Sequence, residues 1–198
     1  MKVKFLYDIH VMNSVHVISI ILTLVFLVYH FRESKVEFLY IKDLLPQHEF
    51  RKIQEKCRQL EPHMESDELS IVENRKRYEI DRNDHISKVL SSKYVQDKLK
   101  ILEAQPSDTP VEYRIYEKGG RMGWHCDDQL YMKRQYEIVY TTENTSNSKT
   151  QWIDPDTKEF YSISTEPNSA LIVRSQSVLH NVTPLGYGTR KILKFAYV

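Results

Sequence analysis

The sequence of 198 residues contains only two cysteines, Cys57 and Cys126, which excludes the disulfide framework of a small secreted domain. Glycine is also scarce, with five residues, and the first of them is Gly119. Neither sign of charge is in excess, because the sequence has 28 lysines and arginines and 27 aspartates and glutamates. We interpret the densest basic run, Arg75-Lys76-Arg77, as solvated surface, and no basic stripe interleaves with aromatic residues. Nucleic acid is therefore not expected as a partner.

One long apolar run stands at the amino terminus, where Val15 to Phe31 carries no formal charge. This length is at the lower limit of about 17 residues for crossing a bilayer. No small-x-small cleavage site accompanies it, so an uncleaved signal anchor is favoured over a cleaved signal peptide or a buried helix. The chain is thus expected to comprise a short tail (1–14), a single-pass transmembrane anchor (15–31) and one domain (36–198). Basic residues flank the anchor on both sides and do not set its orientation.

The pattern of residues after the anchor predicts a mainly β domain with flanking helices. Helices are expected from about Gln47 to Leu60 and from Asp84 to about Leu102, and both are interpreted as scaffold. Extended strands separated by turn-rich segments are expected at 36–45, 136–142, 151–153, 159–164 and 170–174. This arrangement predicts a double-stranded β-helix, or jelly roll, with supporting helices on its amino-terminal side.

His125, Asp127 and His180 are the candidate metal ligands. In an extended segment, side chains two positions apart project from the same side, so His125 and Asp127 can bind one ion while Cys126 points away and packs in the core. His180 follows 55 residues later and must come from another strand. Two imidazoles and one carboxylate occupy one face of an octahedral Fe(II) and leave three positions open. His-x-Asp alone is a weak signal, but all five glycines flank these residues: Gly119, Gly120, Gly123, Gly186 and Gly188.

Two blocks of the sequence carry a resemblance to a known family. Tyr116-Glu-Lys-Gly-Gly-Arg-Met-Gly-Trp-His125-Cys-Asp127 resembles the Tyr-x-x-Gly-Gly-x(4)-His-x-Asp block of the prolyl 4-hydroxylase type of Fe(II) and 2-oxoglutarate-dependent dioxygenases. His180-Asn-Val-Thr-Pro-Leu-Gly-Tyr-Gly-Thr-Arg190 is similar to that family's His-x-x-x-Pro-x(3)-Gly-x-Arg/Lys block. The resemblance covers about 36–198, strongly in these blocks and by pattern elsewhere.

The resemblance implies a set of roles for these residues. His125, Asp127 and His180 would bind Fe(II), and 2-oxoglutarate would be the co-substrate, its distal carboxylate held by Arg190 and the Tyr116 hydroxyl. The implied reaction hydroxylates a substrate C–H bond with O2 and releases succinate and CO2, with ascorbate as a reductant. A proline-containing peptide is the leading substrate, and the catalytic domain is expected in the endoplasmic reticulum or secretory lumen.

Departures from the family pattern leave the substrate open. Met122 stands where collagen-type enzymes often carry a second tyrosine, and Arg190 replaces their lysine, although its planar fork can bind a carboxylate through two hydrogen bonds. Lysyl or small-molecule substrates and a membrane-tethered metal-binding module without catalysis remain alternatives. Nucleic-acid dealkylation is less favoured, because enzymes of that branch carry a second arginine soon after the anchor. Further residues are weighed as site contacts, with core packing or strand hydrogen bonding favoured for each: Tyr113, Trp124, Trp152 and Thr183.

Overall fold

The computed structural model describes Ser19 and residues 36–67 and 70–198 of the chain. Val36–Val198 forms one structural unit. The predicted tail (1–14) lies outside the described residues, and so does the predicted anchor (15–31) apart from Ser19. In the described part of the chain, no helix has the length and apolar character needed to cross a membrane.

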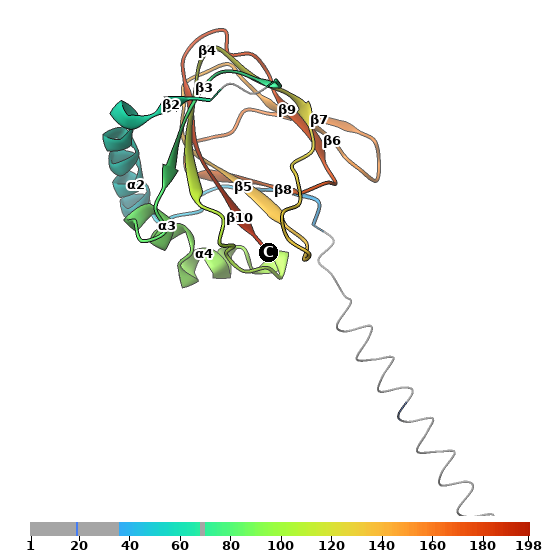
Figure 1. Ribbon diagram of the computed structural model, residues 1–198. Helices are drawn as coiled ribbons and strands as arrows, with labels where there is room; N and C mark the ends of the chain where they lie inside the picture. The colour runs from blue at the N-terminus through green and yellow to red at the C-terminus, as the bar shows by residue number, and fades with distance from the viewer. Residues whose placement is uncertain (1–18, 20–35, 68–69) are drawn as a thin grey trace, which may run out of the picture. The chain divides into compact units, whose positions relative to one another are not determined.

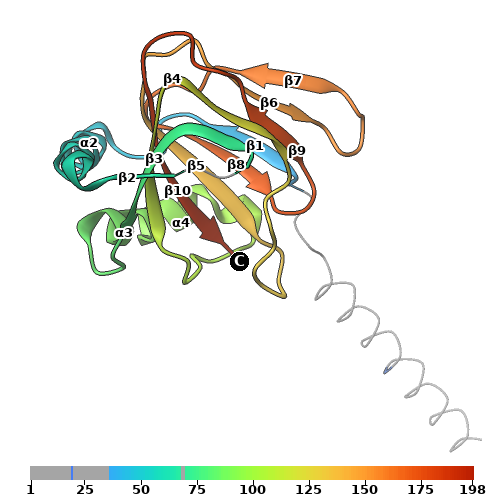
Figure 2. The ribbon, with the colours of Figure 1, turned by 45° about the horizontal axis from the view of Figure 1, so that its top comes forward.

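Ten strands of the described residues pair into one curled sheet: β1 (Phe38–Ile41), β2 (Glu65–Ser66), β3 (Val72–Ile80), β4 (Val111–His125), β5 (Tyr136–Asn144), β6 (Thr150–Ile153), β7 (Phe160–Ile163), β8 (Ser169–Arg174), β9 (Leu179–Val182) and β10 (Arg190–Tyr197). Their order is β1-β8-β5-β10-β4-β9-β6-β7, with β3 beside β4 and β2 beside β3. All of these pairs are antiparallel. The sheet curls around an interior (Figures 1 and 2), which is the mainly β, jelly-roll type of fold that the sequence predicts.

The long strand β4 takes the chain from one side of this curled sheet to the other. β3 pairs with β4 from Val111 to Met122, β10 pairs with its first half, and β9 pairs with its end. Two glycines in the middle of β4 are required by the backbone there. Gly119 has a φ of 84°, and a Cβ on Gly120 would lie 2.7 Å from the carbonyl oxygen of Glu117. β4 thereby brings the residues that follow these glycines to β9.

The helices pack on the outer side of β4, β5 and β10 (Figure 1). α2 (Gln47–Leu60) forms where the sequence predicts it, and its apolar stripe of Phe50, Ile53 and Cys57 is buried. The helix predicted from Asp84 to about Leu102 is wrong in being continuous. It is divided into α3 (His85–Leu90), α4 (Lys93–Lys98) and a 3₁₀ turn, η2 (Lys100–Leu102), while another 3₁₀ turn, η1 (Glu61–His63), follows α2.

The break between α3 and α4 has a local cause. Ser92 has extended backbone angles, with φ −65° and ψ 155°, and its hydroxyl accepts a hydrogen bond from the Val95 N–H. A serine in this conformation begins a new helix, because its side chain satisfies an N–H that has no partner in the first turn. The apolar spacing that suggested one helix therefore continues across two short ones.

Three predictions about exposure are wrong. Arg75 does not lie on a solvated surface, because it is 2% exposed within β3 and forms an ion pair with Asp67. Cys126 is exposed instead of packing in the core, since it follows the last residue of β4. Trp124 is 42% exposed, and its ring lies 6.3 Å from that of Phe160 between centroids.

Candidate metal centre

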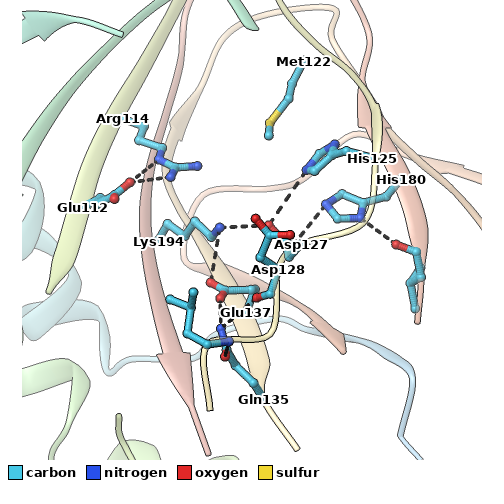
Figure 3. A network of polar contacts seen from close by, with 12 residues as sticks. Glu112, Arg114, Met122, His125, Asp127, Asp128, Gln135, Glu137, His180 and Lys194 are labelled. Carbon is cyan, nitrogen blue, oxygen red and sulfur yellow. Dashed lines mark hydrogen bonds and ion pairs between the residues drawn. The ribbon is translucent and has the colours of Figure 1, made fainter. Parts of the chain in front are cut away.

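His125, Asp127 and His180 come together where the end of β4 lies beside β9 (Figure 3). His125 ends β4 and is the direct cross-strand partner of His180 in β9, so their ring centroids lie 4.2 Å apart. Asp127 follows two residues after the end of β4. One ligand atom from each of the three residues lies within 4.8 Å of the others. A single ion can therefore contact all three side chains.

Hydrogen bonds fix the orientation of both imidazoles. Nδ1 of His125 lies 2.9 Å from the carbonyl oxygen of Gly123, and Nδ1 of His180 lies 2.9 Å from that of Val178. A carbonyl oxygen can only accept, so in each ring Nδ1 carries the proton and Nε2 keeps a lone pair for a metal. Both Nε2 atoms face Asp127, at 3.9 Å from Oδ1 for His125 and 3.4 Å from Oδ2 for His180.

A buried lysine contacts the carboxylate of this cluster. Lys194 Nζ lies 2.9 Å from Oδ1 of Asp127 and 3.3 Å from Oε2 of Glu137 (Figure 3). Burial acts to raise the pKa of Asp127, but the charge of Lys194 and the neighbouring His180 hold that pKa below its usual range. Burial acts in turn to lower the pKa of Lys194, and the two carboxylates raise it instead. Lys194 is therefore a cation, and Asp127 is ionised and ready to bind a metal.

Arg190, the predicted carboxylate anchor, is a buried cation without a counter-ion. It is the first residue of β10 and only 1% exposed. Its Nη2 donates to the Thr150 hydroxyl at 2.8 Å, its Nε has no hydrogen-bond partner, and no carboxylate of the described residues pairs with it. Burial lowers the pKa of Arg190, as expected for a charge removed from water. Such a site suits an anionic ligand, because an anion would supply the missing partner.

Arg190 and the three candidate ligands line one pocket inside the curled sheet. Its other polar walls are the side chains of Arg114, Tyr116, Thr150 and Lys194. Its apolar walls are Met122, Val139, Leu171, Val173, Val182 and Ile192. The proposed anion anchor and the proposed metal ligands therefore line the same pocket.

Tyr116, the second predicted contact of 2-oxoglutarate, lies beside Arg190. The two residues are direct partners across β4 and β10. The Tyr116 hydroxyl accepts a hydrogen bond of 3.1 Å from Nη1 of Arg75, a residue that sequence analysis placed on the surface. Lys194 was also missed as a site residue, although strand alternation from Arg190 places it on the same face of β10.

The remaining candidate contacts have structural roles. Tyr113 is buried in the core under the helices, and its hydroxyl donates to Glu61. The Thr183 hydroxyl accepts from the Lys149 N–H beside β9. Trp152 is partly buried, and its ring stacks on Phe38 with centroids 3.7 Å apart.

Comparison with known proteins places this fold. No family model matches the sequence, and no curated protein matches it significantly. Among solved structures, a Pseudomonas putida prolyl-4-hydroxylase is similar with a TM-score of 0.68 and 15% identity, over 82% of this chain and 92% of that one. A Trichoplax adhaerens prolyl hydroxylase, solved with a peptide fragment of the hypoxia-inducible factor oxygen degradation domain, has a TM-score of 0.66 and 14% identity over 82% and 84% of the two chains.

A third similar structure is that of an enzyme named for epimerisation instead of prolyl hydroxylation. The non-haem α-ketoglutarate-dependent epimerase SnoN of nogalamycin biosynthesis has a TM-score of 0.68 and 9% identity, over 84% of this chain and 77% of that one. Likeness at such low identity establishes the fold, whereas chemistry must be argued from the site. The domain has the fold of prolyl 4-hydroxylases and other Fe(II) and 2-oxoglutarate oxygenases, as its two sequence blocks implied.

Proposed function

We propose that the protein is an Fe(II)- and 2-oxoglutarate-dependent dioxygenase that hydroxylates a C–H bond of its substrate. The observation that carries this proposal is that one pocket holds the cluster of His125, Asp127 and His180 together with Arg190, a buried cation that has no counter-ion among the described residues. A metal-binding module without catalysis would need the cluster but would have no use for that cation.

The donor set fits the metal. Two imidazole nitrogens and one carboxylate are the ligands that non-haem Fe(II) oxygenases use, and they leave open positions for a co-substrate and O2. When bound, Fe(II) and 2-oxoglutarate would supply the oxidation, in which one oxygen atom of O2 enters the substrate C–H bond and 2-oxoglutarate is converted to succinate and CO2. Arg190 and Tyr116 would hold the distal carboxylate of 2-oxoglutarate.

The protein's own contribution is to orient groups and to exclude water. The carbonyl groups of Gly123 and Val178 fix the two imidazoles, and Lys194 fixes the Asp127 carboxylate. Apolar side chains line much of the pocket and limit the water that would compete with Arg190 for a carboxylate: Val139, Leu171, Val173, Val182 and Ile192. A charge-assisted hydrogen bond in such surroundings is stronger than the same bond in water.

We propose a prolyl 4-hydroxylase-like activity on peptides as the finer assignment. Two of the similar structures are prolyl hydroxylases, and one of them was solved with a peptide. Exposed aromatic side chains also lie near the candidate ligands. Trp124 directly precedes His125, and Tyr161 stacks on Trp152, the cross-strand partner of His180. Aromatic surfaces of this kind bind extended proline-containing peptides. Lysyl or small-molecule substrates are the alternatives, and the likeness to an epimerase keeps the second of these open.

Succinate formation tests both levels of the proposal. The purified protein is incubated with Fe(II), ascorbate and 2-oxoglutarate, with and without proline-rich peptides, beside a His180→Ala control. Peptide-stimulated turnover that the control lacks supports a peptidyl hydroxylase. A gain in peptide mass equal to one oxygen atom identifies the hydroxylated product. Turnover without stimulation supports the oxygenase and rejects the peptides tried. Bound iron without any turnover would favour the non-catalytic module.

We propose further that residues 15–31 anchor the protein in a membrane, because this run carries no formal charge. The placement of the domain in the secretory lumen rests on the family resemblance alone. Carbonate extraction of membranes tests the anchor, and protease protection tests the orientation. Release of the intact chain by carbonate would contradict anchoring.

A further inference from the structure

Arg75, Tyr116 and Arg190 form one row across three adjacent strands. Arg75 in β3 is the direct partner of Tyr116 in β4, and Tyr116 is the direct partner of Arg190 in β10. Directly paired residues project from the same face of a sheet, and both arginines are almost completely buried. Tyr116 is therefore flanked by two buried guanidinium groups at the end of the pocket where Arg190 lies.

The two arginines differ in their charge balance. Nε and Nη2 of Arg75 both contact Oδ2 of Asp67, at 2.7 Å and 2.6 Å, and Asp67 is itself buried. Arg190 has only the neutral Thr150 hydroxyl as a partner among the described residues. Arg75 thus adds no net charge to the pocket, and Arg190 adds one positive charge. A single carboxylate of a ligand would balance Arg190, whereas Arg75 is already balanced.

The contact with Arg75 determines where the Tyr116 proton can point. A phenolic hydroxyl has one proton to donate and accepts through its oxygen. Nη1 of Arg75 donates to that oxygen at 3.1 Å, so the proton must turn away from the guanidinium. Its one acceptor among the described residues is the Met122 sulfur at 3.7 Å, which is a weak acceptor. The Tyr116 proton is therefore available to a stronger acceptor in the pocket.

On the basis of the proposed function, we propose that Arg75, held by Asp67, is a positioning residue for the co-substrate. It occupies the accepting side of the Tyr116 hydroxyl, so that Tyr116 donates its proton to the carboxylate that Arg190 binds. Arg75 itself does not contact the co-substrate in this arrangement. Nη1 of Arg75 also donates to the Met122 sulfur at 3.4 Å, but sulfur is a weak acceptor, so the main effect of Arg75 on binding should depend on the Tyr116 hydroxyl.

A double-mutant cycle tests this dependence without turnover. Binding of 2-oxoglutarate to the Mn(II)-loaded protein is measured by calorimetry, and Mn(II) binding is measured separately. Arg75→Met is combined with Asp67→Asn, so that no buried carboxylate is left without a partner. The second arm is Tyr116→Phe, and the matched control is Lys76→Met in the same strand, because the Lys76 side chain is 47% exposed and pairs with Glu117.

We expect Asp67→Asn/Arg75→Met to raise the Kd for 2-oxoglutarate about tenfold, the weaker end of the range for a hydrogen bond to a charged group. Tyr116→Phe should have a similar effect, and adding it to the double variant should weaken binding by no more than about twofold further. Mn(II) binding and the Lys76→Met control should match the wild type. If Asp67→Asn/Arg75→Met does not fold, Arg75→Lys retains a cation for Asp67 and should weaken binding with the same dependence on Tyr116.

Either of two results would overturn the positioning role. One is an unchanged Kd in the Arg75 variants, and the other is an Arg75 effect that is just as large in the Tyr116→Phe background. Arg190→Met separates this failure from failure of the proposed function. If the wild type and Arg190→Met bind 2-oxoglutarate equally, or neither binds it, the proposed function fails together with the positioning role. If Arg190→Met loses binding while the Arg75 variants give either of these two results, the proposed function stands and only the role of Arg75 is rejected.

Discussion

Lys194 donates a hydrogen bond of 2.9 Å to Oδ1 of Asp127, the carboxylate of the candidate metal centre. The other oxygen, Oδ2, lies 3.4 Å from Nε2 of His180. The lysine therefore holds Oδ1, which also lies 3.9 Å from Nε2 of His125, and leaves Oδ2 beside His180 without a lysine contact. This arrangement favours ligation of a metal through a single oxygen. It also balances the charge of Asp127 before any metal binds.

This ion pair predicts the behaviour of Lys194→Met. Removing the lysine leaves Asp127 and Glu137 buried without their cation, so the metal-free protein should lose about 3 kcal/mol of stability, as is typical when one partner of a buried pair is removed. Bound metal supplies positive charge beside Asp127, so Mn(II) should raise the Tm of the variant by more than it raises that of the wild type. Thermal unfolding with and without Mn(II) measures both effects.

The exposed Lys76→Met variant is the control for that experiment. It should show the wild-type Tm and the wild-type response to Mn(II). An equal Mn(II)-induced rise in the Lys194→Met variant and the wild type would show that the lysine does not compensate for the missing metal.

Arg190→Met should separate stability from ligand binding. A buried cation that has no counter-ion in the described part of the chain destabilises the fold, and methionine, an unbranched apolar but shorter side chain, removes that cost. The variant should therefore be as stable as the wild type or more stable, by up to about 2 kcal/mol, without ligand. It should also lose the stabilisation that 2-oxoglutarate gives the metal-loaded wild type. Urea unfolding with and without 2-oxoglutarate tests this, and marked destabilisation of the ligand-free variant would contradict it.

The candidate site was largely predictable from the sequence, because its signals are local. His125 and Asp127 are two positions apart on an extended segment, and Arg190 follows His180 at the spacing of the family block. The position of Lys194 was available from the same reasoning, since every second residue after Arg190 lies on the same face of β10. The charge pair with Asp127 was not, because it depends on how two distant segments meet.

Arg75 shows what sequence patterns cannot reveal. It stands in a run of three basic residues, and nothing in that run separates the buried arginine from its exposed neighbours Lys76 and Arg77. Its burial depends on the pairing of β3 with β4 and on the Asp67 carboxylate. The break between α3 and α4 was missed although its cause is local. There the local cap at Ser92 outweighed an apolar spacing that continues through it.

Gly188, two residues before Arg190, should be intolerant of alanine. Its φ is 69°, and a Cβ there would overlap the carbonyl group of Thr145, which is backbone and cannot move aside easily. Gly186→Ala is the matched control, because its Cβ would meet only the side chain of Asn147, at 3.1 Å. We expect Gly188→Ala to cost about 2 to 3 kcal/mol and to weaken 2-oxoglutarate binding by displacing Arg190, with a smaller cost for Gly186→Ala. Equal losses in denaturant unfolding would contradict this account.

The two cysteines should differ sharply in reactivity. Cys57 is buried in α2, and burial raises the pKa of its thiol to about 12. Cys126 is exposed, and its thiol pKa is raised as well, first by partial burial and then by Asp127. Since the thiolate is the reactive form, a thiol reagent at pH 8 should modify one cysteine in the native protein and two after unfolding. Cys126→Ser should abolish the native reaction, and a second native thiol would contradict the burial of Cys57.

The raised pKa of Cys57 also predicts a loss of stability at alkaline pH. The folded state holds this proton more tightly than the unfolded state, whose thiol keeps a pKa near 9.0. The stabilisation is therefore complete below pH 9 and is lost as the pH rises from there toward 12. Between pH 8 and 10.5 the wild type should lose roughly 2 kcal/mol more than Cys57→Ala, since groups whose raised pKa does not depend on Cys57, such as Tyr197, titrate alike in both proteins. Urea unfolding of the two proteins at both pH values measures this difference, and parallel losses would show that the Cys57 thiol titrates alike in the folded and unfolded states.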